Sequence, residues 1–353
     1  MHVKPSTKTP TVPTINLASV VYGLEDYLRE RDADPAEVLR RAELDSEDLL
    51  DPERRVPLIR YLELLELCAA ELEDTHFGLK FGARYDPRHA GVVGNVALAS
   101  RTVGEALQTI GRYLPTMVDS AVFGLEVEGD KAFAYSYYVD PLLMGYQQKN
   151  DWAVAFVCNV IRHGLSDPDW RPDEALFPHL PPEGVAERRA RARTLCASIR
   201  VGHPWAGIRF DTAVLEWPLK TADGMIERLM RHYGDLRLSG LEGRDEIAVL
   251  RRNIAQLLVH GESSIEQLAR RVGWSVRTLQ RRLAARGVKY SDLLDDVRKT
   301  LALNLLENRS LCIAQIAYSV GYSDVSAFNH AFRRWIGQAP GDYRKSQRLQ
   351  PDR

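Results

Sequence analysis

One pattern occurs twice near the C-terminal end of the sequence, first as Ile265-Glu-Gln-Leu-Ala-Arg-Arg-Val-Gly-Trp-Ser-Val-Arg-Thr-Leu-Gln-Arg-Arg-Leu283 and again as Ile313-Ala-Gln-Ile-Ala-Tyr-Ser-Val-Gly-Tyr-Ser-Asp-Val-Ser-Ala-Phe-Asn-His-Ala-Phe332. Equivalent residues match at one constant offset as far as Ser275 and Ser323. After these serines, the second copy carries one extra residue at its turn. A duplicated unit therefore decides the fold of this region.

Each copy contains the parts of a helix-turn-helix motif. An amphipathic first helix ends at a glycine, Gly273 or Gly321, which can adopt the positive φ that turns the chain. The serine two residues later, Ser275 or Ser323, is expected to cap the second helix. Two ordinary helical hairpins are the alternative, but two copies in register with the same glycine and cap favour the motif. The second helices bury residues one turn apart: Leu279 and Leu283, or Phe328 and Phe332.

The opposite face of each second helix carries side chains that can reach base edges in a DNA groove. The expected base-reading residues are Arg277, Gln280 and Arg281 in the first copy, and Val325, Ser326, Asn329 and His330 in the second. Phosphate contacts give affinity without sequence choice. The candidates for them are Ser275, Arg282, Ser323, Arg333 and Arg334. For the arginines among these candidates, a solvated surface charge remains the alternative.

The segment between the copies, residues 290–308, carries a helical apolar stripe (Leu294, Val297, Leu301 and Leu305). It predicts one long helix that holds the two hairpins at a fixed separation. Two reading helices on one face of a duplex need about one turn, roughly 34 Å, between them. A single chain is therefore expected to occupy two successive major-groove segments.

Charge is distributed unevenly along the 353 residues, whose formal net charge is −1. From residue 244 onward there are 19 Lys and Arg against 11 Asp and Glu, while the preceding part has 28 against 37. This near-neutral total excludes a uniformly basic coat, and the asymmetry indicates that the C-terminal part meets a polyanion. Chance segregation of surface charge is the alternative.

Composition predicts a soluble protein of about two domains. The four cysteines form no CxxC pair, which argues against a zinc ribbon or a disulfide scaffold and fits a reducing cytosol. They are Cys68, Cys158, Cys196 and Cys312. We find no signal peptide, no membrane span, no P-loop and no HExxH or GxSxG motif. We therefore expect no catalytic residues, no metal site and no cofactor.

The N-terminal part mixes helical and strand patterns and is expected to be α+β. A flexible arm is expected over 1–14, a domain over 15–233, a glycine-containing linker over 234–243, an all-α domain over 244–345 and a tail over 346–353. Two predicted helices begin at Leu17 and at Pro35, and two more cover residues 152–161 and 222–233. The predicted strands cover residues 122–127, 132–139, 199–201, 208–210 and 215–217.

Aromatic residues gather around the second predicted strand, at Tyr135, Tyr137, Tyr138, Tyr146 and Trp152. Aromatic walls with a few polar groups are typical of small-molecule sites. An acidic domain with such walls can suit a cationic amine through cation–π attraction. The alternative is that these residues form core or a dimer surface.

The C-terminal region resembles the AraC/XylS family of bacterial transcription regulators. The resemblance rests on Val272-Gly-Trp-Ser-Val-Arg-Thr-Leu-Gln-Arg-Arg-Leu283 and on Phe328-Asn-His-Ala-Phe-Arg-Arg-Trp-Ile-Gly-Gln-Ala-Pro-Gly-Asp-Tyr-Arg344. It implies a seven-helix DNA-binding domain with two helix-turn-helix motifs joined by a long helix. The family usually has Arg where His330 stands, so the second hairpin is a candidate for weaker or pH-dependent binding.

The N-terminal region resembles the arabinose-binding type of sensor domain found in regulators of ornithine utilisation. The matching stretches are Gly91-Val-Val-Gly-Asn-Val-Ala-Leu-Ala-Ser-Arg-Thr-Val-Gly-Glu-Ala-Leu107, His203-Pro-Trp-Ala-Gly-Ile-Arg-Phe210 and Leu215-Glu-Trp-Pro-Leu219. This resemblance implies an effector-binding domain that is also a candidate for homodimerisation. The effector it implies is an amino acid, an amine or a fatty acid.

Together these resemblances imply a cytoplasmic, nucleoid-associated transcription regulator that is not an enzyme. We expect an activator that binds double-stranded operator DNA, responds to a small effector and contacts RNA polymerase, with no membrane partner. Two alternatives stay open: a constitutive DNA-binding protein whose N-terminal domain only dimerises, and an enzyme fused to a DNA-binding module.

Overall fold

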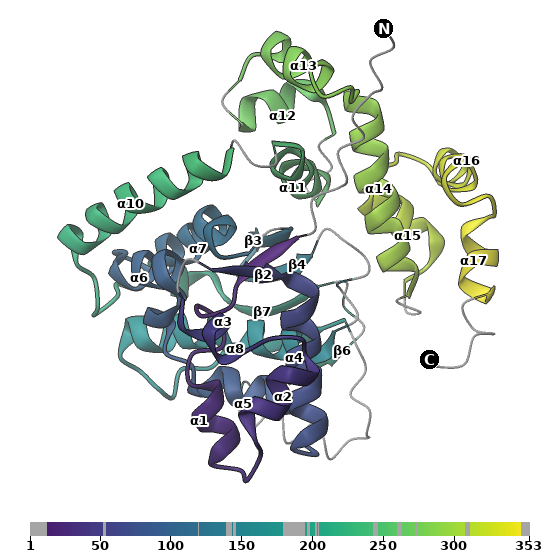
Figure 1. The fold of residues 1–353 in the computed structure, drawn as a ribbon. Coiled ribbons are helices and arrows are strands. Elements are labelled where there is room, and N and C mark those ends of the chain that lie inside the picture. Colours follow the sequence, from purple (N-terminus) through teal and green to yellow (C-terminus); the bar gives the residue numbers. More distant parts are fainter. Residues whose placement is uncertain are drawn as a thin grey trace, which may run out of the picture.

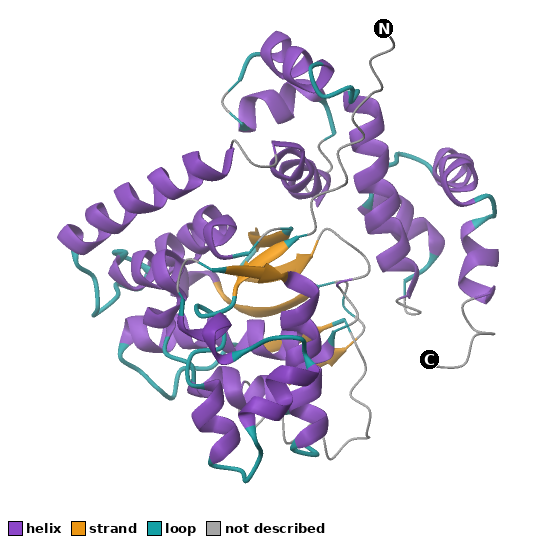
Figure 2. Ribbon diagram, viewed as in Figure 1, coloured by secondary structure: helices purple, strands orange, loops and turns teal. Residues whose placement is uncertain are grey.

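The computed structural model describes residues 13–51, 54–118, 120–138, 143, 146–178, 195, 198–201, 203, 205–242, 246–259, 263–272, 274–307 and 311–346. It has an N-terminal α+β part and a C-terminal part built of helices, as Figures 1 and 2 show. Residues 1–12 of the expected arm lie outside the described part of the chain, and Thr14, its last residue, belongs to a strand. Most of the expected tail also lies outside them.

A five-stranded sheet forms the centre of the N-terminal part, in the order β3-β4-β7-β5-β6. The pair β5–β6 is parallel and the other neighbours are antiparallel. The predicted hairpin is confirmed, and it turns at Gly129, whose φ is +63°. The strands are β3 (Ala121–Glu128), β4 (Lys131–Tyr138), β5 (Glu174–Phe177), β6 (Ser198–Val201) and β7 (Ala206–Asp211); β1 (Thr14–Asn16) pairs separately with β2 (Arg55–Pro57).

Helices surround this sheet, and their buried faces build one large apolar core. They are α1 (Leu24–Arg29), α2 (Pro35–Arg41), α3 (Ser46–Leu50), α4 (Leu58–Glu71), α5 (Phe77–Arg84), α6 (Gly91–Ala99), α7 (Val103–Met117), α8 (Gln147–Leu165) and α10 (Gly224–Glu242), with 3-10 turns η1 (Pro87–Ala90) and η3 (Thr212–Glu216).

Two predicted elements of this part are wrong. The apolar residues from Leu17 are buried as expected, but they lie in turns, and α1 begins only at Leu24. Gly23 precedes it with a φ of +79°, outside the helical range. The predicted strand at 215–217 is also wrong, because η3 covers this chain up to Glu216.

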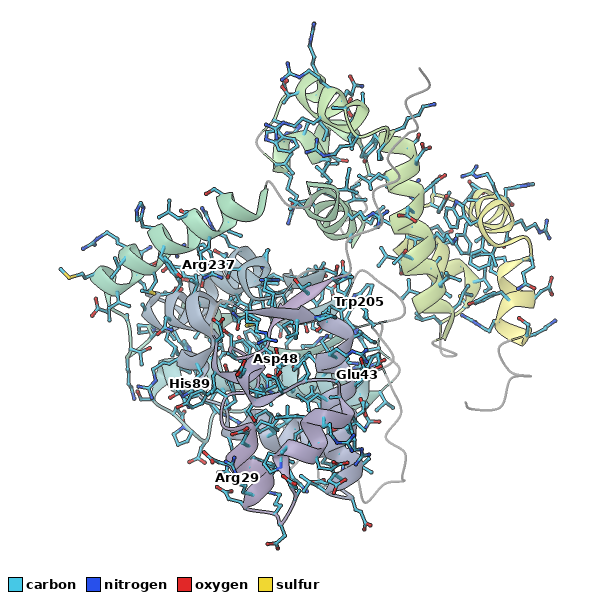
Figure 3. All side chains as sticks on the ribbon, in the orientation of Figure 1. Arg29, Glu43, Asp48, His89, Trp205 and Arg237 are labelled. Carbon is cyan, nitrogen blue, oxygen red and sulfur yellow. The ribbon has the colours of Figure 1, made fainter. Side chains whose placement is uncertain are left out.

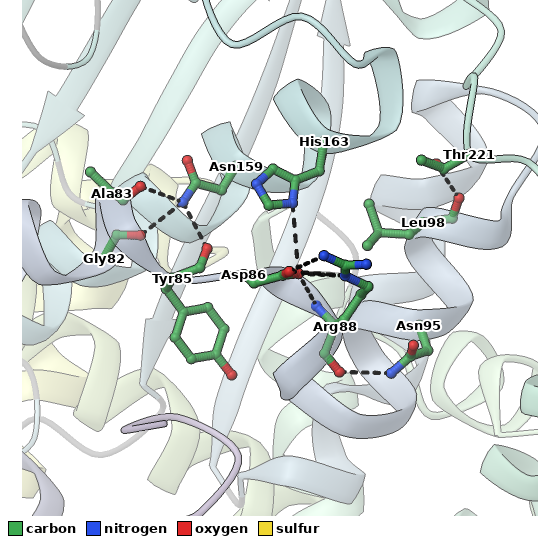
Figure 4. Close-up of polar contacts among 10 residues, drawn as sticks. All are labelled: Gly82, Ala83, Tyr85, Asp86, Arg88, Asn95, Leu98, Asn159, His163 and Thr221. Atoms are coloured by element: carbon green, nitrogen blue, oxygen red, sulfur yellow. Dashed lines mark hydrogen bonds and ion pairs between the residues drawn. The ribbon is translucent and has the colours of Figure 1, made fainter. Parts of the chain in front are cut away.

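Helix α8 crosses α5 at close range. Added Cβ atoms would lie 2.0 Å from the Gln148 carbonyl oxygen at Gly78 and 2.8 Å from the Ala155 Cβ at Gly82. The Asn159 amide donates to the carbonyls of Gly82, Ala83 and Tyr85 at 2.9, 3.1 and 2.9 Å (Figure 4). The end of α5 is thereby tied to the centre of α8.

The expected glycine-containing linker is helical as far as the structure describes it. Helix α10 continues through Gly234, where an added Cβ would lie 2.6 Å from the Tyr113 ring. The next residue, Asp235, accepts a hydrogen bond from the Tyr113 hydroxyl at 3.0 Å and pairs with Arg112 at 2.9 Å. These contacts hold the second half of α10 on α7, which is why the chain does not turn at this glycine.

The C-terminal part consists of helices around a second apolar cluster. Its long helix, α14, has 18 residues and is therefore about 27 Å long. In Figure 1, α12 and α13 lie near the start of α14, α15 lies beside its other end, and α16 and α17 lie farther out on that side. The helices are α11 (Glu246–Val259), α12 (Ile265–Arg271), α13 (Val276–Ala284), α14 (Tyr290–Glu307), α15 (Ile313–Ser319), α16 (Val325–Ile336) and α17 (Pro340–Ser346).

Candidate nucleic-acid interface and ligand cavity

The first hairpin, α12–α13, has the predicted cap and core. The Ser275 hydroxyl accepts a hydrogen bond from the Thr278 amide at 3.1 Å, which starts α13. Leu279 and Leu283 are buried beneath the helix. Gly273 lies outside the described residues. The opposite face of α13 exposes the three residues expected to read bases: Arg277, Gln280 and Arg281.

The second hairpin, α15–α16, turns at Gly321, whose φ of +77° is the predicted positive value. Its cap differs from the prediction. Asp324, not Ser323, accepts the hydrogen bond from the Ala327 amide, at 2.8 Å. The extra residue of this copy shifts the start of α16 by one position, so the carboxylate takes the place of the hydroxyl.

The face of α16 that is expected to read bases is less exposed than the corresponding face of α13. Ser326 and His330 are exposed, whereas Val325 and Asn329 are half-buried. Val325 also packs against the C-terminal apolar cluster. None of these four positions carries an arginine, whereas α13 has two among the residues expected to read bases.

Two arginines, neither of them predicted from the sequence to have this role, hold the second hairpin in place. Arg298 of α14 donates to the carbonyls of Val320 and Gly321 at 3.1 and 2.9 Å, and its guanidinium lies 4.6 Å from the centre of the Tyr322 ring. Arg344 donates to the carbonyls of Leu306 and Leu311 at 3.0 and 2.8 Å. Arg344 belongs to the C-terminal stretch that carries the family resemblance, which is a signal for its importance. For Arg298, the only signal in the sequence is its position on the predicted long helix.

The candidate phosphate-contacting residues have different surroundings. Arg282 lies over the Trp274 ring at 4.3 Å from its centre. Arg334 is exposed but pairs with Asp295 of α14 at 2.5 Å, which ties α16 to α14. Arg333, Ser275 and Ser323 are exposed.

The expected aromatic pocket divides into two sets, because side chains alternate along a strand. Tyr135 and Tyr137 stack beside Trp205, with ring centres 6.4 and 4.2 Å from it. This set belongs to the C-terminal cluster, together with Leu250 of α11. Figure 3 labels Trp205 on the side of the N-terminal part that faces the C-terminal helices.

The other aromatic residues face the interior of the N-terminal part. Tyr138 and Trp152 line a cavity of about 50 Å³ between the sheet, α7 and α8. Tyr146 precedes α8 and is not part of the wall. The walls are almost wholly apolar; among the described residues, the one charged side chain is that of Lys149. Burial lowers the pKa of Lys149 to about 7.

The described residues contain no group of three or more His, Cys, Asp or Glu side chains suited to a metal ion. No described helix is long and apolar enough to cross a membrane.

Comparison with known proteins assigns both parts. Residues 33–219 match the arabinose-binding domain of AraC transcription regulators, and residues 268–346 match a helix-turn-helix domain. The chain therefore belongs to the AraC family of transcription regulators. It has a ligand-binding N-terminal domain and a DNA-binding C-terminal domain that binds operator DNA, and its relatives are regulators, not enzymes.

Relatives match over nearly the whole chain. The HTH-type transcriptional regulator VirS of Mycobacterium tuberculosis is 31% identical over 93% of this chain and 95% of its own length. The ornithine utilization regulator of Pseudomonas aeruginosa is 26% identical over 96% and 99%. The crystal structure of transcriptional regulator CdpR from Pseudomonas aeruginosa aligns with a TM-score of 0.43 and 24% identity, covering 92% of this chain and 96% of that one.

Proposed function

We propose that the protein is an activator whose two reading helices, α13 and α16, enter successive major grooves. The observation that carries this proposal is the exposure of Arg277, Gln280 and Arg281 on α13, directly above its buried leucines. On α16 the corresponding residues are Val325, Ser326, Asn329 and His330. Ser275, Ser323, Arg282 and Arg333 are proposed to contact phosphates, and Arg334 can do so only in addition to its ion pair with Asp295.

We further propose that an effector bound in the N-terminal domain changes how these helices meet DNA. The strands β3 and β4 support this mechanism, since they line the cavity with one face and pack against α11 with the other. A ligand can shift the equilibrium between two arrangements only by its difference in affinity for them. Movement of the shared strands supplies such a difference.

The test begins by selecting a binding site from random DNA with the full chain. Operator affinity is then measured by fluorescence anisotropy across a library of metabolites. A molecule that changes operator affinity, or transcription from a promoter carrying that site, is the expected result. A constitutive DNA-binding protein shows neither change with any ligand that binds the N-terminal domain.

A homodimer through α10 is also proposed. One face of this helix packs on α6 and α7, while the other exposes apolar side chains one turn apart. Arg228 is exposed beside this stripe, whereas Glu227 pairs with Arg231 of the same helix at 2.7 Å. In a two-fold contact the same stripe of both copies meets itself. The exposed stripe consists of Met225, Ile226, Leu229, Tyr233 and Leu236.

Sedimentation of the full chain tests this contact. Leu229→Glu is expected to convert dimers to monomers. The matched control is Val127→Glu, at an exposed apolar residue of β3, which is expected to leave the dimer intact. A monomeric parent chain, or a Leu229→Glu variant that remains dimeric, contradicts the proposal.

The domain bounds, the partner in transcription and the place of action are proposed together with this function. We propose that the effector-binding unit extends from residue 15 to the end of α10 and the DNA-binding unit from residue 244 to 345. Activation then requires contact with RNA polymerase, and the place of action is the bacterial nucleoid.

A further inference from the structure

We propose that the cavity between the sheet, α7 and α8 binds an apolar molecule that carries one carboxylate, with Lys149 pairing with that carboxylate. This inference rests on the proposed function, because it names the chemical class of the effector. All but two of the residues that line the cavity lie within the matched arabinose-binding domain, residues 33–219; Ile15 and Val20 precede it.

Lys149 is a buried cation without a carboxylate partner among the described residues. The residue is only 6% exposed, and its side chain lines a cavity with apolar walls. Burying a charge is costly unless the charge is paired. Among the described residues, no carboxylate lies within ion-pair distance of its Nζ atom. The contacts of Nζ are the Asn150 Oδ1 atom at 3.4 Å and the face of the Tyr138 ring, 4.1 Å from its centre.

The local electric field also disfavours the charge of Lys149. Lys149 stands in the first turn of α8, a helix of 19 residues, where the helix dipole disfavours a cation and favours an anion. A purely structural position in this apolar wall suits a Leu or Met better. The Glu66 carboxylate already accepts a hydrogen bond from the Gln148 amide in this turn, at 2.9 Å, so the positive group left for an anionic ligand in the cavity is the ammonium group of Lys149.

The charge of the site selects the class of ligand. A cationic amine, the expectation from the aromatic residues, would meet Lys149 inside apolar walls and be repelled. A dianionic phosphate would leave one charge unpaired in the same walls. One carboxylate balances one ammonium group, and the walls formed by Phe123, Leu114 and Phe156 accept the rest of the molecule.

The volume of the cavity limits what can enter without movement. A cavity that binds benzene in another protein measures about 150 Å³, whereas this one measures about 50 Å³. A larger apolar body must therefore displace wall residues. Such displacement would reach β3 and β4, whose opposite faces pack with α11.

The probes are octanoate, octan-1-ol and octylamine, which share one chain and differ in head-group charge. Binding to the full chain is measured by calorimetry near pH 7. Octanoate is expected to bind the parent chain at least about tenfold more tightly than octan-1-ol, which corresponds to about 1.4 kcal/mol, and octylamine is expected to bind least.

Lys149→Met is expected to abolish the preference for the acid over the alcohol, since it keeps the bulk and removes the charge. The matched control is Lys220→Met at an exposed lysine outside the cavity, which is expected to preserve that preference. Equal binding of acid and alcohol by the parent chain, preference for octylamine, no binding of octanoate, or a preference that survives Lys149→Met would each overturn the assignment.

Acidity provides a second readout. Tyr61 and Tyr138 are the other titratable residues of the wall, and burial raises the pKa of both far above neutrality. Octanoate affinity should then fall by about tenfold per pH unit above about 7, because binding requires the protonated Lys149. A pH-independent affinity between about 7 and 9 contradicts the pairing.

The same samples separate this inference from the proposed function. Operator affinity and promoter activity are measured with and without octanoate. Lys149-dependent binding that changes neither of them supports the carboxylate site and contradicts effector control by it. A different metabolite that changes operator affinity without needing Lys149, in a chain that binds no octanoate, supports effector control and overturns the carboxylate site.

Discussion

Tyr137 and Tyr138 are consecutive residues of β4 whose side chains belong to two different clusters. Tyr138 lines the cavity that holds Lys149, while the Tyr137 ring stacks on Trp205 at 4.2 Å within the cluster that includes α11. The thickness of one strand thus separates the interior of the ligand-binding domain from a helix of the DNA-binding domain. This relationship gives the two domains a short physical connection.

The hydroxyls of two neighbouring tyrosines predict opposite responses to the same substitution. The buried Tyr137 hydroxyl has no hydrogen-bond partner among the described residues, whereas the Tyr135 hydroxyl donates to Glu126 at 2.5 Å. Tyr137→Phe is therefore expected to raise the free energy of unfolding by about 1 kcal/mol, and Tyr135→Phe to lower it by a similar amount. Urea unfolding monitored by fluorescence measures both. Equal effects of the two changes would show that the hydroxyl of Tyr137 has a partner.

Gly321 combines a positive φ with close packing, and Gly287 is its matched control. Both have a left-handed φ, +77° and +70°, but only at Gly321 would an added Cβ meet a neighbour, Leu258 Cδ2 at 2.8 Å. Gly287→Ala is expected to cost about 1–2 kcal/mol, and Gly321→Ala about 1 kcal/mol or more beyond that. Thermal unfolding of the two variants decides this, and equal losses would mean that Leu258 moves without cost.

Base reading by α13 is tested one side chain at a time. Arg277→Ala and Gln280→Ala are each expected to cost about 1–3 kcal/mol on the selected operator and to relax sequence choice at one base pair. Anisotropy measured with operators altered at single base pairs gives both quantities. Arg171→Ala, at an exposed arginine of the N-terminal domain, is the control for loss of charge. An equal loss on random DNA would assign the residue to a phosphate.

Stability is expected to depend on pH through Lys149. Burial lowers its pKa from 10.5 to about 7 in the folded chain, so between these values the unfolded chain binds more protons. The stability of the parent chain therefore rises with pH across this window. Lys149→Met is expected to be more stable by a few kcal/mol near pH 7, with a gap that narrows towards about pH 10. Thermal unfolding in a pH series measures the gap, and a constant gap would contradict the cause.

Local sequence signals predicted the elements that depend on local chemistry. The duplicated helix-turn-helix units, the positive φ of Gly321 and the β3–β4 hairpin are confirmed because each depends on residues close in sequence. The cap of α16 was misplaced by one residue, since Ser323 and Asp324 are both good caps and only the backbone decides between them.

Tertiary contacts set the features that the sequence did not reveal. Helix α10 continues past Gly234 because Tyr113 and Arg112 hold Asp235, and those partners are far away in the sequence. The burial of Lys149 could not be predicted for the same reason. A lysine beside polar residues in the sequence is expected to be exposed, and only the contacts with α7 and the sheet bury it. The division of the aromatic residues into two sets can partly be predicted from the sequence, because side chains alternate along a strand and Tyr137 and Tyr138 therefore point to opposite faces.

The difference between α13 and α16 has a consequence for the orientation in which one copy binds DNA. The first presents two arginines and a glutamine, and the second presents valine, serine, asparagine and histidine. A DNA segment that one copy reads with both α13 and α16 is not a palindrome, because inverting the segment would place the wrong bases opposite each helix. With the proposed base reading by α13 and α16, one copy binds its segment of DNA in a single orientation, and the two copies of the proposed two-fold dimer bind segments of opposite orientation.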